Sequence, residues 1–342
     1  MNRVRITNVT SAHPGRRVRQ EEAVRLIAEM SGDGRRAAAV ARGTKIETRA
    51  IALSAAEIMA LGTIESRNLL YHKIAPGMAF DASSCSLADT DRDSVGCIVT
   101  SSCTGYSVPG WGATLIERHG LRNDTVRVPL TESGCGGGVV ALACAADYVA
   151  AHRGRSALVV AAEVCSLAFH ATGDDGNLMS SLIFGDGAGA ALLEPGHGRG
   201  LEILDRSSTL IPNSRELLGF DLTDRGFFPV LRRELVARLV PAAGAAVQEL
   251  LARNCLAAGD IGAWLLHPGG ARILCELEAG LGLEREKTRW SWDSMREFGN
   301  TSSAAIFDVI RRYNDDAVEN PLALVAAFGP GVAIELLLVR RS

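Results

Sequence analysis

The chain has 342 residues, of which 47% are hydrophobic and 22% charged, and its formal net charge is −3. This composition is typical of a soluble globular protein with enough residues for two ordinary domains or one large one. A slightly acidic chain gives no support for nucleic acid or a membrane surface as a partner, because both favour a basic face.

The cysteines and the N-terminus bear on the cellular compartment. The eight cysteines include no C-x-x-C pair, which argues against a zinc ribbon or a thioredoxin-type motif. A chain of this length does not need disulfides, so we expect reduced thiols and a cytoplasmic location. Residues 1–6 lack the apolar stretch of a signal peptide. The most apolar runs, residues 157–162 and 322–327, have the length of strands, so we expect no membrane span.

The first half of the chain predicts alternating helices and strands. Residues 16–30 place apolar side chains among charges, which suits an amphipathic helix that residues 31–34 (SGDG) end. The elements expected after it are a strand at 94–101, a turn at 102–108, a helix at 114–119 stopped by Gly120, a strand at 126–130, a buried helix at 139–152, a strand at 157–162, and a glycine turn with a strand within 180–194.

The second half repeats this alternation. Its expected elements are a strand at 262–266, helices at 271–281 and 302–313, and strands at 322–327 and 332–339 with a tight turn between them. Short apolar strands that alternate with helices favour an α/β fold with largely buried sheets.

Cys135 is the first candidate functional residue. It lies within Ser-Gly-Cys-Gly-Gly-Gly, between a predicted strand and an Ala-rich helix. At such a junction the helix N-terminus lowers the pKa of a thiol, and glycines let the backbone approach a substrate or supply N–H groups to an oxyanion. Taken alone, a small buried cysteine beside a tight turn explains the pattern more often than catalysis does.

Two further junctions and one turn complete the pattern. His267 follows an apolar strand and precedes Pro-Gly-Gly, and Asn300 follows a glycine before an Ala-rich helix. Each has an ordinary structural explanation, a core histidine or a helix cap. The turn Phe328-Gly329-Pro330-Gly331 fits a simple hairpin. Together, a cysteine, a histidine and an asparagine at such junctions form a coherent nucleophile, base and orienting amide.

At these residues the sequence resembles the type III polyketide synthases, the chalcone-synthase-like family within the thiolase superfamily. The resemblance runs from about residue 93 to the C-terminus and is thin before it, where only RRVRQEEA and IETR are similar. HPGG together with FGPG favours this family over the priming ketoacyl-carrier-protein synthases. Its motifs here are TSSCTGYSVPG, RVPLTESGCGGG, ALVVAAEVCSLAF, LIFGDGAGA, LLHPGG, FGNTSSA and AFGPG.

The resemblance implies a thiolase-like α/β fold, a five-layered αβαβα core made of two duplicated halves, usually as a homodimer. Residues 1–205 would form the half that carries Cys135, and residues 206–342 the half that carries His267 and Asn300. Further positions of the family fall on residues of the cavity: the gatekeeper Phe184, the scaffold loop Gly329, Pro330 and Gly331, the wall residue Cys103, and Val108, which would reach into the partner's cavity.

The mechanism implied needs no metal or redox cofactor, and its substrates are CoA thioesters. His267 as an imidazolium would stabilise the Cys135 thiolate, which takes an acyl group from an acyl-CoA. Malonyl-CoA would then lose carbon dioxide beside His267 and Asn300, which donate hydrogen bonds to the developing enolate. The carbanion would attack the Cys135 thioester, and the extended chain would cyclise to a pyrone or phenolic product.

Several positions depart from the family pattern. Pro229, next to Phe228, stands where a second gatekeeper is often Phe, and Ala168 replaces a bulkier residue. Both changes would widen the cavity, so we expect an aliphatic starter. Arg35, Arg36 and Arg42 are candidates for the CoA phosphates, although a solvated charged face explains them equally well. The alternatives are a single condensation of two acyl thioesters, with an acyl carrier protein as a possible donor, and a non-catalytic partner subunit.

Overall fold

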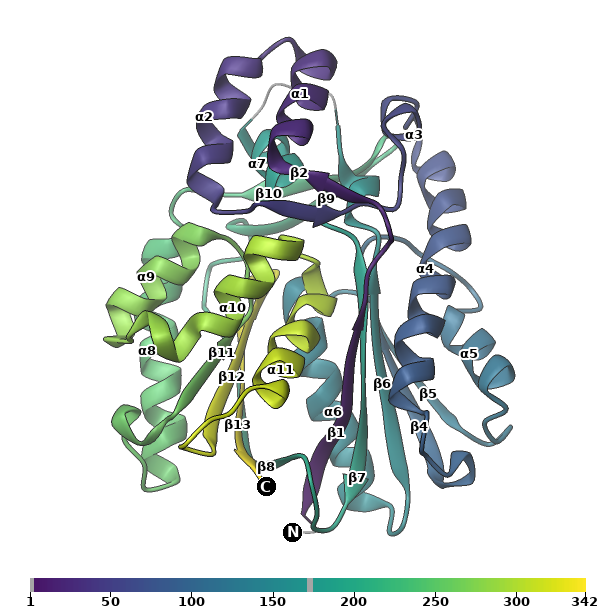
Figure 1. Cartoon of the computed structure of the whole chain (residues 1–342), viewed down its shortest axis with the longest axis vertical. Coiled ribbons are helices and arrows are strands. Elements are labelled where there is room, and N and C mark those ends of the chain that lie inside the picture. Colours follow the sequence, from purple (N-terminus) through teal and green to yellow (C-terminus); the bar gives the residue numbers. More distant parts are fainter. Residues whose placement is uncertain (1–2, 171–174) are drawn as a thin grey trace.

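The computed structural model describes residues 3–170 and 175–342, and a single mixed sheet runs through the part it describes (Figure 1). Nine strands lie in the order β11-β12-β13-β8-β1-β7-β6-β4-β5 in these residues. The first half supplies β1 (Val4–Ala12), β4 (Val95–Ser101), β5 (Val126–Leu130), β6 (Ser156–Glu163) and β7 (Gly187–Pro195). The second half supplies β8 (Leu201–Leu210), β11 (Ala263–Leu266), β12 (Leu322–Gly329) and β13 (Ala333–Arg341).

The two halves of the sheet meet at a narrow join. β1 pairs with β8 only through Arg5 and Ile6, whereas β1 and β7 pair along most of their length. β4 runs parallel to β5 and β6, and β11 runs parallel to β12, while the remaining pairs are antiparallel. The predicted boundary at residues 205 and 206 falls inside β8, and it stays a prediction.

Helices cover both faces of each half and lie between the halves. The central layer consists of α6 (Gly137–Ala151) and α11 (Ala305–Asp315). One outer layer contains α4 (Ile64–Ser86) and α5 (Trp111–His119), and the other contains α8 (Leu235–Arg253), α9 (Ala271–Leu281) and α10 (Arg285–Phe298). The layers therefore follow the order αβαβα, which confirms the five-layered core predicted from the sequence.

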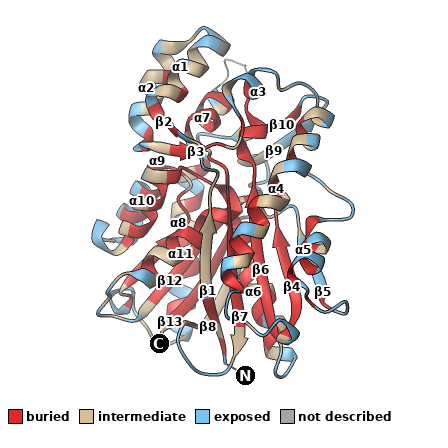
Figure 2. Cartoon of the chain, turned by 45° about the vertical axis from the view of Figure 1, so that its right-hand side comes forward, coloured by how far each residue is buried: buried red, intermediate tan, exposed pale blue. Residues whose placement is uncertain are grey.

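The alternation of side chains along each strand builds this layering. In β6, Val159 packs into the central cluster while Leu158 and Val160 pack against the outer helices. Because successive side chains of a strand point to opposite faces, a strand between two helical layers is apolar at every position. Figure 2 shows the result for β4 and β6, which are buried along their whole length.

Smaller elements gather over one end of the sheet, at the top of Figure 1. They include the hairpin of β9 (Leu218–Thr223) and β10 (Gly226–Leu231), which pairs with no strand of the main sheet. The others are β2 (Arg17–Arg19), α1 (Gln20–Ser31), α2 (Gly34–Thr44), β3 (Thr48–Ala50), α3 (Ala55–Met59) and α7 (Asp175–Ile183). The carboxyl ends of β4 and β6 lie beneath these elements.

Most predicted elements are confirmed, and two expectations need correction. The first predicted helix begins later, at Gln20, because Arg17–Arg19 pairs with Thr48–Ala50 as a strand. The expectation that no segment is long and apolar enough to span a membrane is wrong by composition. Residues 134–151 and helix α8 both pass that test. In this fold α6 occupies the central layer and α8 packs on β8 and β13, so core packing explains their apolar character.

Glycines bring the turn around Cys135 against the second half. The turn is the short helix η2 (Gly134–Gly136), which leads directly into α6. Gly134 has φ +48°, and a Cβ there would lie 2.5 Å from Pro330 Cδ. A Cβ on Gly138 would lie 2.4 Å from the backbone oxygen of Ser303. Backbone of one half therefore packs directly on the other.

We predict that Gly138→Ala destabilises the protein, because the added Cβ meets a backbone atom that a rotamer change cannot move. The free energy of unfolding should fall by about 1–3 kcal/mol, measured by denaturant titration. The control is Gly77→Ala in α4, where a Cβ meets nothing within 4 Å. That variant should be unchanged or more stable by up to about 1 kcal/mol. Equal stability of both variants would contradict the close packing at Gly138.

Candidate active site

Cys135 lies in η2, at the point where the chain turns from β5 into α6. The Gly136 N–H donates to Ser133 O at 3.0 Å, which closes the turn beneath the thiol. Cys135 keeps part of its surface exposed, in contrast to Cys97 and Cys165, which are buried. The predicted position of the thiol at a helix N-terminus is thus present.

His267 follows β11 directly and is 2% exposed. Its backbone N–H donates to Ala326 O at 2.7 Å, so pairing with β12 extends one residue into the turn. In the described part of the chain, neither ring nitrogen has a hydrogen-bond partner. Burial lowers the pKa of His267 to about 3. The imidazole is therefore neutral, and both of its nitrogens are available to a substrate.

Asn300 is fixed on both sides of its peptide. Its N–H donates to Ile183 O at 2.9 Å, and its carbonyl accepts from Gly185 N at 3.0 Å. Its side-chain Oδ1 accepts from Ser302 N at 2.8 Å. The N-cap of the short helix η5 (Ser302–Ala304) is Thr301, so the helix-cap explanation of Asn300 is wrong. The bond to Ser302 directs the amide Nδ2 toward Cys135 Sγ, 3.8 Å away.

The thiol of Cys135 has only weak polar neighbours. Ser302 Oγ lies 3.8 Å and Asn300 Oδ1 4.0 Å from the sulfur. Burial raises the pKa of Cys135 to about 11, because removal from water disfavours the thiolate. Burial therefore favours the neutral form of both Cys135 and His267. The imidazolium–thiolate pair expected from the sequence stays a prediction.

One cavity joins the three candidate catalytic residues. Cys135, His267 and Asn300 line it, together with three other residues that the sequence singled out, Phe184, Pro229 and Pro330. The rest of the lining is almost entirely apolar and consists of Gly134, Met179, Ser180, Ile183, Leu218, Gly219, Phe220, Val230, Leu231, Leu235, Leu239, Gly269, Ile273 and Phe328. Phe220, which the sequence analysis missed, pairs with Pro229 across the hairpin.

The remaining predicted cavity residues do not line this cavity. Cys103 Sγ lies 3.4 Å from Ser302 Oγ, so the two cysteines share a neighbour. Ala168 is buried in the turn after β6, and Phe228 stacks on His170. Val108 is 77% exposed at the surface.

The scaffold loop, Gly329-Pro330-Gly331, packs against the turn around Cys135 and against the β9–β10 hairpin. A Cβ on Gly329 would lie 2.6 Å from Ser133 O, so this glycine allows the turn around Cys135 to sit on β12. The N–H of Gly331 donates to Leu218 O at 3.1 Å, which ties the loop to the hairpin. Gly329 and Gly331 therefore support the cavity, and Pro330 between them lines it.

Glu163 is a buried carboxyl group that the sequence analysis missed. It ends β6, is fully buried, and accepts hydrogen bonds from Cys103 N (3.0 Å), Thr104 Oγ1 (2.9 Å) and Ser303 Oγ (2.5 Å). Burial raises the pKa of this carboxyl group. The sequence signal that could have identified Glu163 is a charged residue directly after the apolar strand at residues 157–162. Glu163 holds the turn after β4 against the second half.

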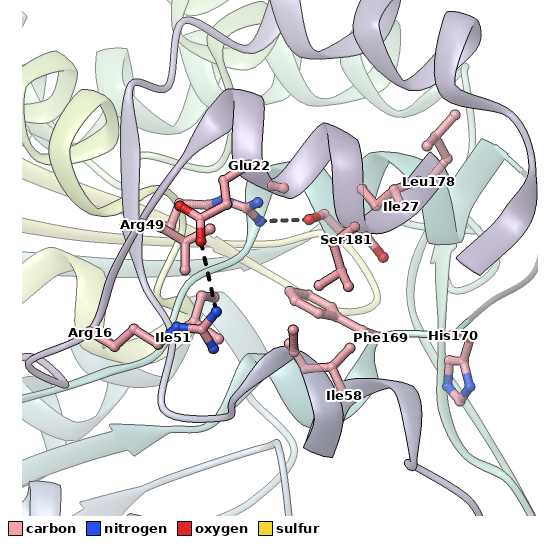
Figure 3. A pocket seen from close by; sticks show the side chains of 14 residues that line it. Arg16, Glu22, Ile27, Arg49, Ile51, Ile58, Phe169, His170, Leu178 and Ser181 are labelled. Atoms are coloured by element: carbon pink, nitrogen blue, oxygen red, sulfur yellow. Dashed lines mark hydrogen bonds and ion pairs between the residues drawn. The ribbon is translucent and has the colours of Figure 1, made fainter. Parts of the chain in front are cut away.

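Arg49 fixes the position of Phe184. It is buried in β3, and its Nη1 donates to Ser181 O at 2.6 Å and to Phe184 O at 2.9 Å. These carbonyls belong to the end of α7, where helical carbonyls lack partners within the helix. Burial lowers the pKa of Arg49 to about 10, which leaves it charged. Figure 3 shows the bond to Ser181 beside a second, small cavity on the other side of α7.

An arginine-lined groove leads to the catalytic cavity from the surface. Groove and cavity share six lining residues, Met179, Ile183, Leu231, Leu235, Gly269 and Ile273. The arginines that line the groove are Arg232, Arg233 and Arg272, and the α2 side contributes Ala39, Val40 and Gly43.

The three arginines singled out on α2 do not line this groove. Arg36 forms ion pairs with Asp33 and with Asp175, and Asp175 itself lines the groove. Arg42 lines an adjacent groove, which Arg272 also lines, and Arg35 is exposed on the helix surface. The cations at the mouth of the cavity therefore come mainly from the second half of the chain.

Comparison with known proteins places this geometry in a family. The family models that match are "Chalcone and stilbene synthases, N-terminal domain" over residues 42–196 and "C-terminal domain" over residues 202–342. The 1,3,6,8-tetrahydroxynaphthalene synthase of Streptomyces coelicolor is 31% identical over 300 residues, which are 86% of this chain and 80% of that protein. The α-pyrone synthesis polyketide synthase-like Pks18 of Mycobacterium tuberculosis is 28% identical, over 97% of this chain and 90% of its own.

The fold agrees with these sequence matches. The crystal structure of the S. coelicolor tetrahydroxynaphthalene synthase, a bacterial type III polyketide synthase, covers 99% of both chains with a TM-score of 0.93 and 29% identity. The thiolase-like core, the matching family models and the relatives all indicate the same family. The chain is a member of the type III polyketide synthases, the chalcone- and stilbene-synthase-like family of acyltransferases.

Proposed function

We propose that this enzyme condenses an aliphatic acyl-CoA starter with malonyl-CoA units on Cys135 and cyclises the product to a pyrone or a phenol. The observation that carries the proposal is the convergence of Cys135, His267 and Asn300 on one apolar cavity that an arginine-lined groove joins to the surface. Thiol, imidazole and amide supply the proposed chemistry, so we propose that it needs no metal or redox cofactor.

Acyl loading begins from the neutral pair. As Cys135 Sγ attacks the thioester carbonyl, its proton passes to His267, and His267 returns that proton to the departing CoA sulfur. Both ring nitrogens of His267 lack partners, so one can accept this proton. The ion pair predicted from the sequence is then a transient state, formed only while substrate occupies the cavity.

In the decarboxylation step, His267 and Asn300 both act as hydrogen-bond donors. The malonyl thioester oxygen accepts hydrogen bonds from His267 and from Asn300 Nδ2, and these donors stabilise the enolate that forms as carbon dioxide leaves. The enolate carbon attacks the Cys135 thioester, which forms the carbon–carbon bond and releases the Cys135 sulfur. The orientation of Asn300 by Ser302 N supports this role, because the amide needs no rearrangement to donate.

The cavity lining supports an aliphatic starter. Leu, Ile, Val and Met side chains outnumber the aromatic Phe184, Phe220 and Phe328, and Pro229 stands opposite Phe220. The relatives are named for different products, a tetrahydroxynaphthalene and an α-pyrone, so the names alone do not select one. An aliphatic tail gains free energy from apolar walls in proportion to the area it buries.

A homodimer and a cytoplasmic location belong to the same proposal. Tyr106 and Val108 are 63% and 77% exposed, on the segment that would enter the partner's cavity. Such exposed apolar side chains are typical of an interface. All eight cysteines lie in the described residues and are free thiols, as in a reducing compartment.

We predict that Cys135→Ala abolishes condensation of a panel of aliphatic and aromatic acyl-CoAs with malonyl-CoA. Product formation, read by mass, should fall by more than about 10³-fold, because no acyl-enzyme forms. Cys85→Ala, an exposed cysteine on α4, is the control and should retain full activity. Continued product formation by Cys135→Ala would overturn the proposal. Products from carrier-protein thioesters but none from CoA thioesters would instead favour a ketosynthase making one condensation.

The neutral resting state predicts how alkylation of Cys135 depends on pH. For a thiol with a pKa of about 11, the thiolate fraction rises with every pH unit up to that value. Iodoacetamide should therefore alkylate Cys135 about tenfold faster per pH unit from pH 7 to pH 10. The rate is measured by mass, with Cys85, Cys255 and Cys275 changed to Ser because these cysteines are exposed. A rate that levels off below pH 8 would show an ionised pair in the resting enzyme.

The arginines of the groove predict where CoA phosphates bind. Arg272 lines both the groove and its neighbour, and its side chain has no hydrogen-bond or ion-pair partner within the described residues. We expect Arg272→Ala to raise KM for malonyl-CoA about tenfold, from the loss of one charge-assisted hydrogen bond, with kcat nearly unchanged. Arg35→Ala is the matched control and should leave KM unchanged. An unaltered KM in Arg272→Ala would exclude this arginine from the CoA site.

A further inference from the structure

The β9–β10 hairpin forms one wall of the catalytic cavity without belonging to the main sheet. Phe220 of β9 and Pro229 of β10 face each other and line the cavity. Backbone ties hold the ends of the hairpin: Leu218 O accepts from Gly331 N at 3.1 Å, and Asp224 O accepts from Ile64 N at 2.8 Å. A separate attachment is therefore needed to fix the middle of β10.

His170 supplies this attachment. It is 5% exposed, and its ring stacks on Phe228 with centroids 3.8 Å apart and planes inclined by 14°. Its Nε2 lies 2.9 Å from Phe227 O. Because side chains alternate along a strand, Phe228 faces His170 while its neighbour Pro229 faces the cavity. Any displacement of Phe228 therefore moves Pro229.

Arg67 fixes the ring of His170 in turn. This buried arginine of α4 places Nη2 3.1 Å from His170 Nδ1 and donates through Nη1 to Leu167 O (2.5 Å) and Phe169 O (3.0 Å). Arginine only donates, so Nδ1 accepts, and Nε2 must carry the hydrogen that it donates to Phe227 O. A Cβ on Gly226 would lie 2.7 Å from Arg67 Cδ, which shows how closely the hairpin packs on this arginine.

We propose that His170 is a specificity-determining positioning residue, which latches β10 and so sets the size of the cavity around the growing chain. The inference rests on the proposed function. His170 does not line the cavity and touches no reacting atom, so it acts through the placement of Pro229 and Phe220. Loosening the latch enlarges the space available to the bound polyketide and changes the number of extensions before release.

The test is the product distribution of His170→Ala with one aliphatic acyl-CoA and malonyl-CoA. We expect the ratio of longer to shorter products to change at least threefold, while the rate of starter loading onto Cys135 stays within about twofold. His170→Gln keeps a donor near Nε2 and should restore part of the original ratio. His170→Phe keeps the stacked ring, leaves Arg67 without its acceptor, and should resemble His170→Ala. His170→Gln and His170→Phe also test the proposal if His170→Ala fails to fold.

The matched control is His152→Ala. His152 also stacks on an aromatic ring, that of Tyr148 at 4.0 Å, but it is exposed at the end of α6 and lines no part of the cavity. Its product ratio should equal that of the unaltered enzyme. An unchanged ratio in all folded His170 variants would overturn the latch, and so would an equal loss of loading and of every product. Absence of any condensed product from the unaltered enzyme would instead overturn the proposed function.

Discussion

The relative placement of Cys135, His267 and Asn300 depends on direct packing between the turn around Cys135 and the second half of the chain. Gly138 lies against Ser303, and Gly134 lies against Pro330, with no side chain between them. Contacts of this kind cannot adapt by rotamer changes, because backbone and proline ring atoms have little freedom to move. The distance from Cys135 to His267 and Asn300 is therefore set by the fold itself.

Burial then determines the charge state of the site. His267 and Glu163 are buried and Cys135 is half-buried, and burial disfavours the charged form of each. A neutral thiol is a weak nucleophile, and a neutral site is suited to long apolar intermediates. In the proposed mechanism, Cys135 gives up its proton only as it attacks the carbonyl of a bound thioester.

The sequence predicted the candidate functional residues that stand beside glycines and close to apolar strands. Cys135, His267 and Asn300 each stand at a glycine-marked junction, and the strands beside them are apolar throughout, so the candidate site and the buried sheets were predictable. The five-layered core was expected from the family resemblance. Helix α4 was not, because its buried face carries Arg67, Ser83 and Ser86, which hide the helical period of apolar residues. Arg232 and Arg272 meet at the groove only after folding. No local pattern marks such a meeting.

The separation of the β9–β10 hairpin from the main sheet has an evolutionary consequence. Most strands of the main sheet, such as β4, β6 and β12, are buried on both faces, so most substitutions there cost stability. The hairpin contributes one wall of the reaction chamber but little of the core, so its sequence can drift at low cost to folding. Substitutions in the hairpin can then reshape the cavity wall while Cys135, His267 and Asn300 stay in place. In this architecture, the residues of the proposed chemistry and the hairpin that shapes the cavity wall lie in different segments of one chain, so each can change without the other.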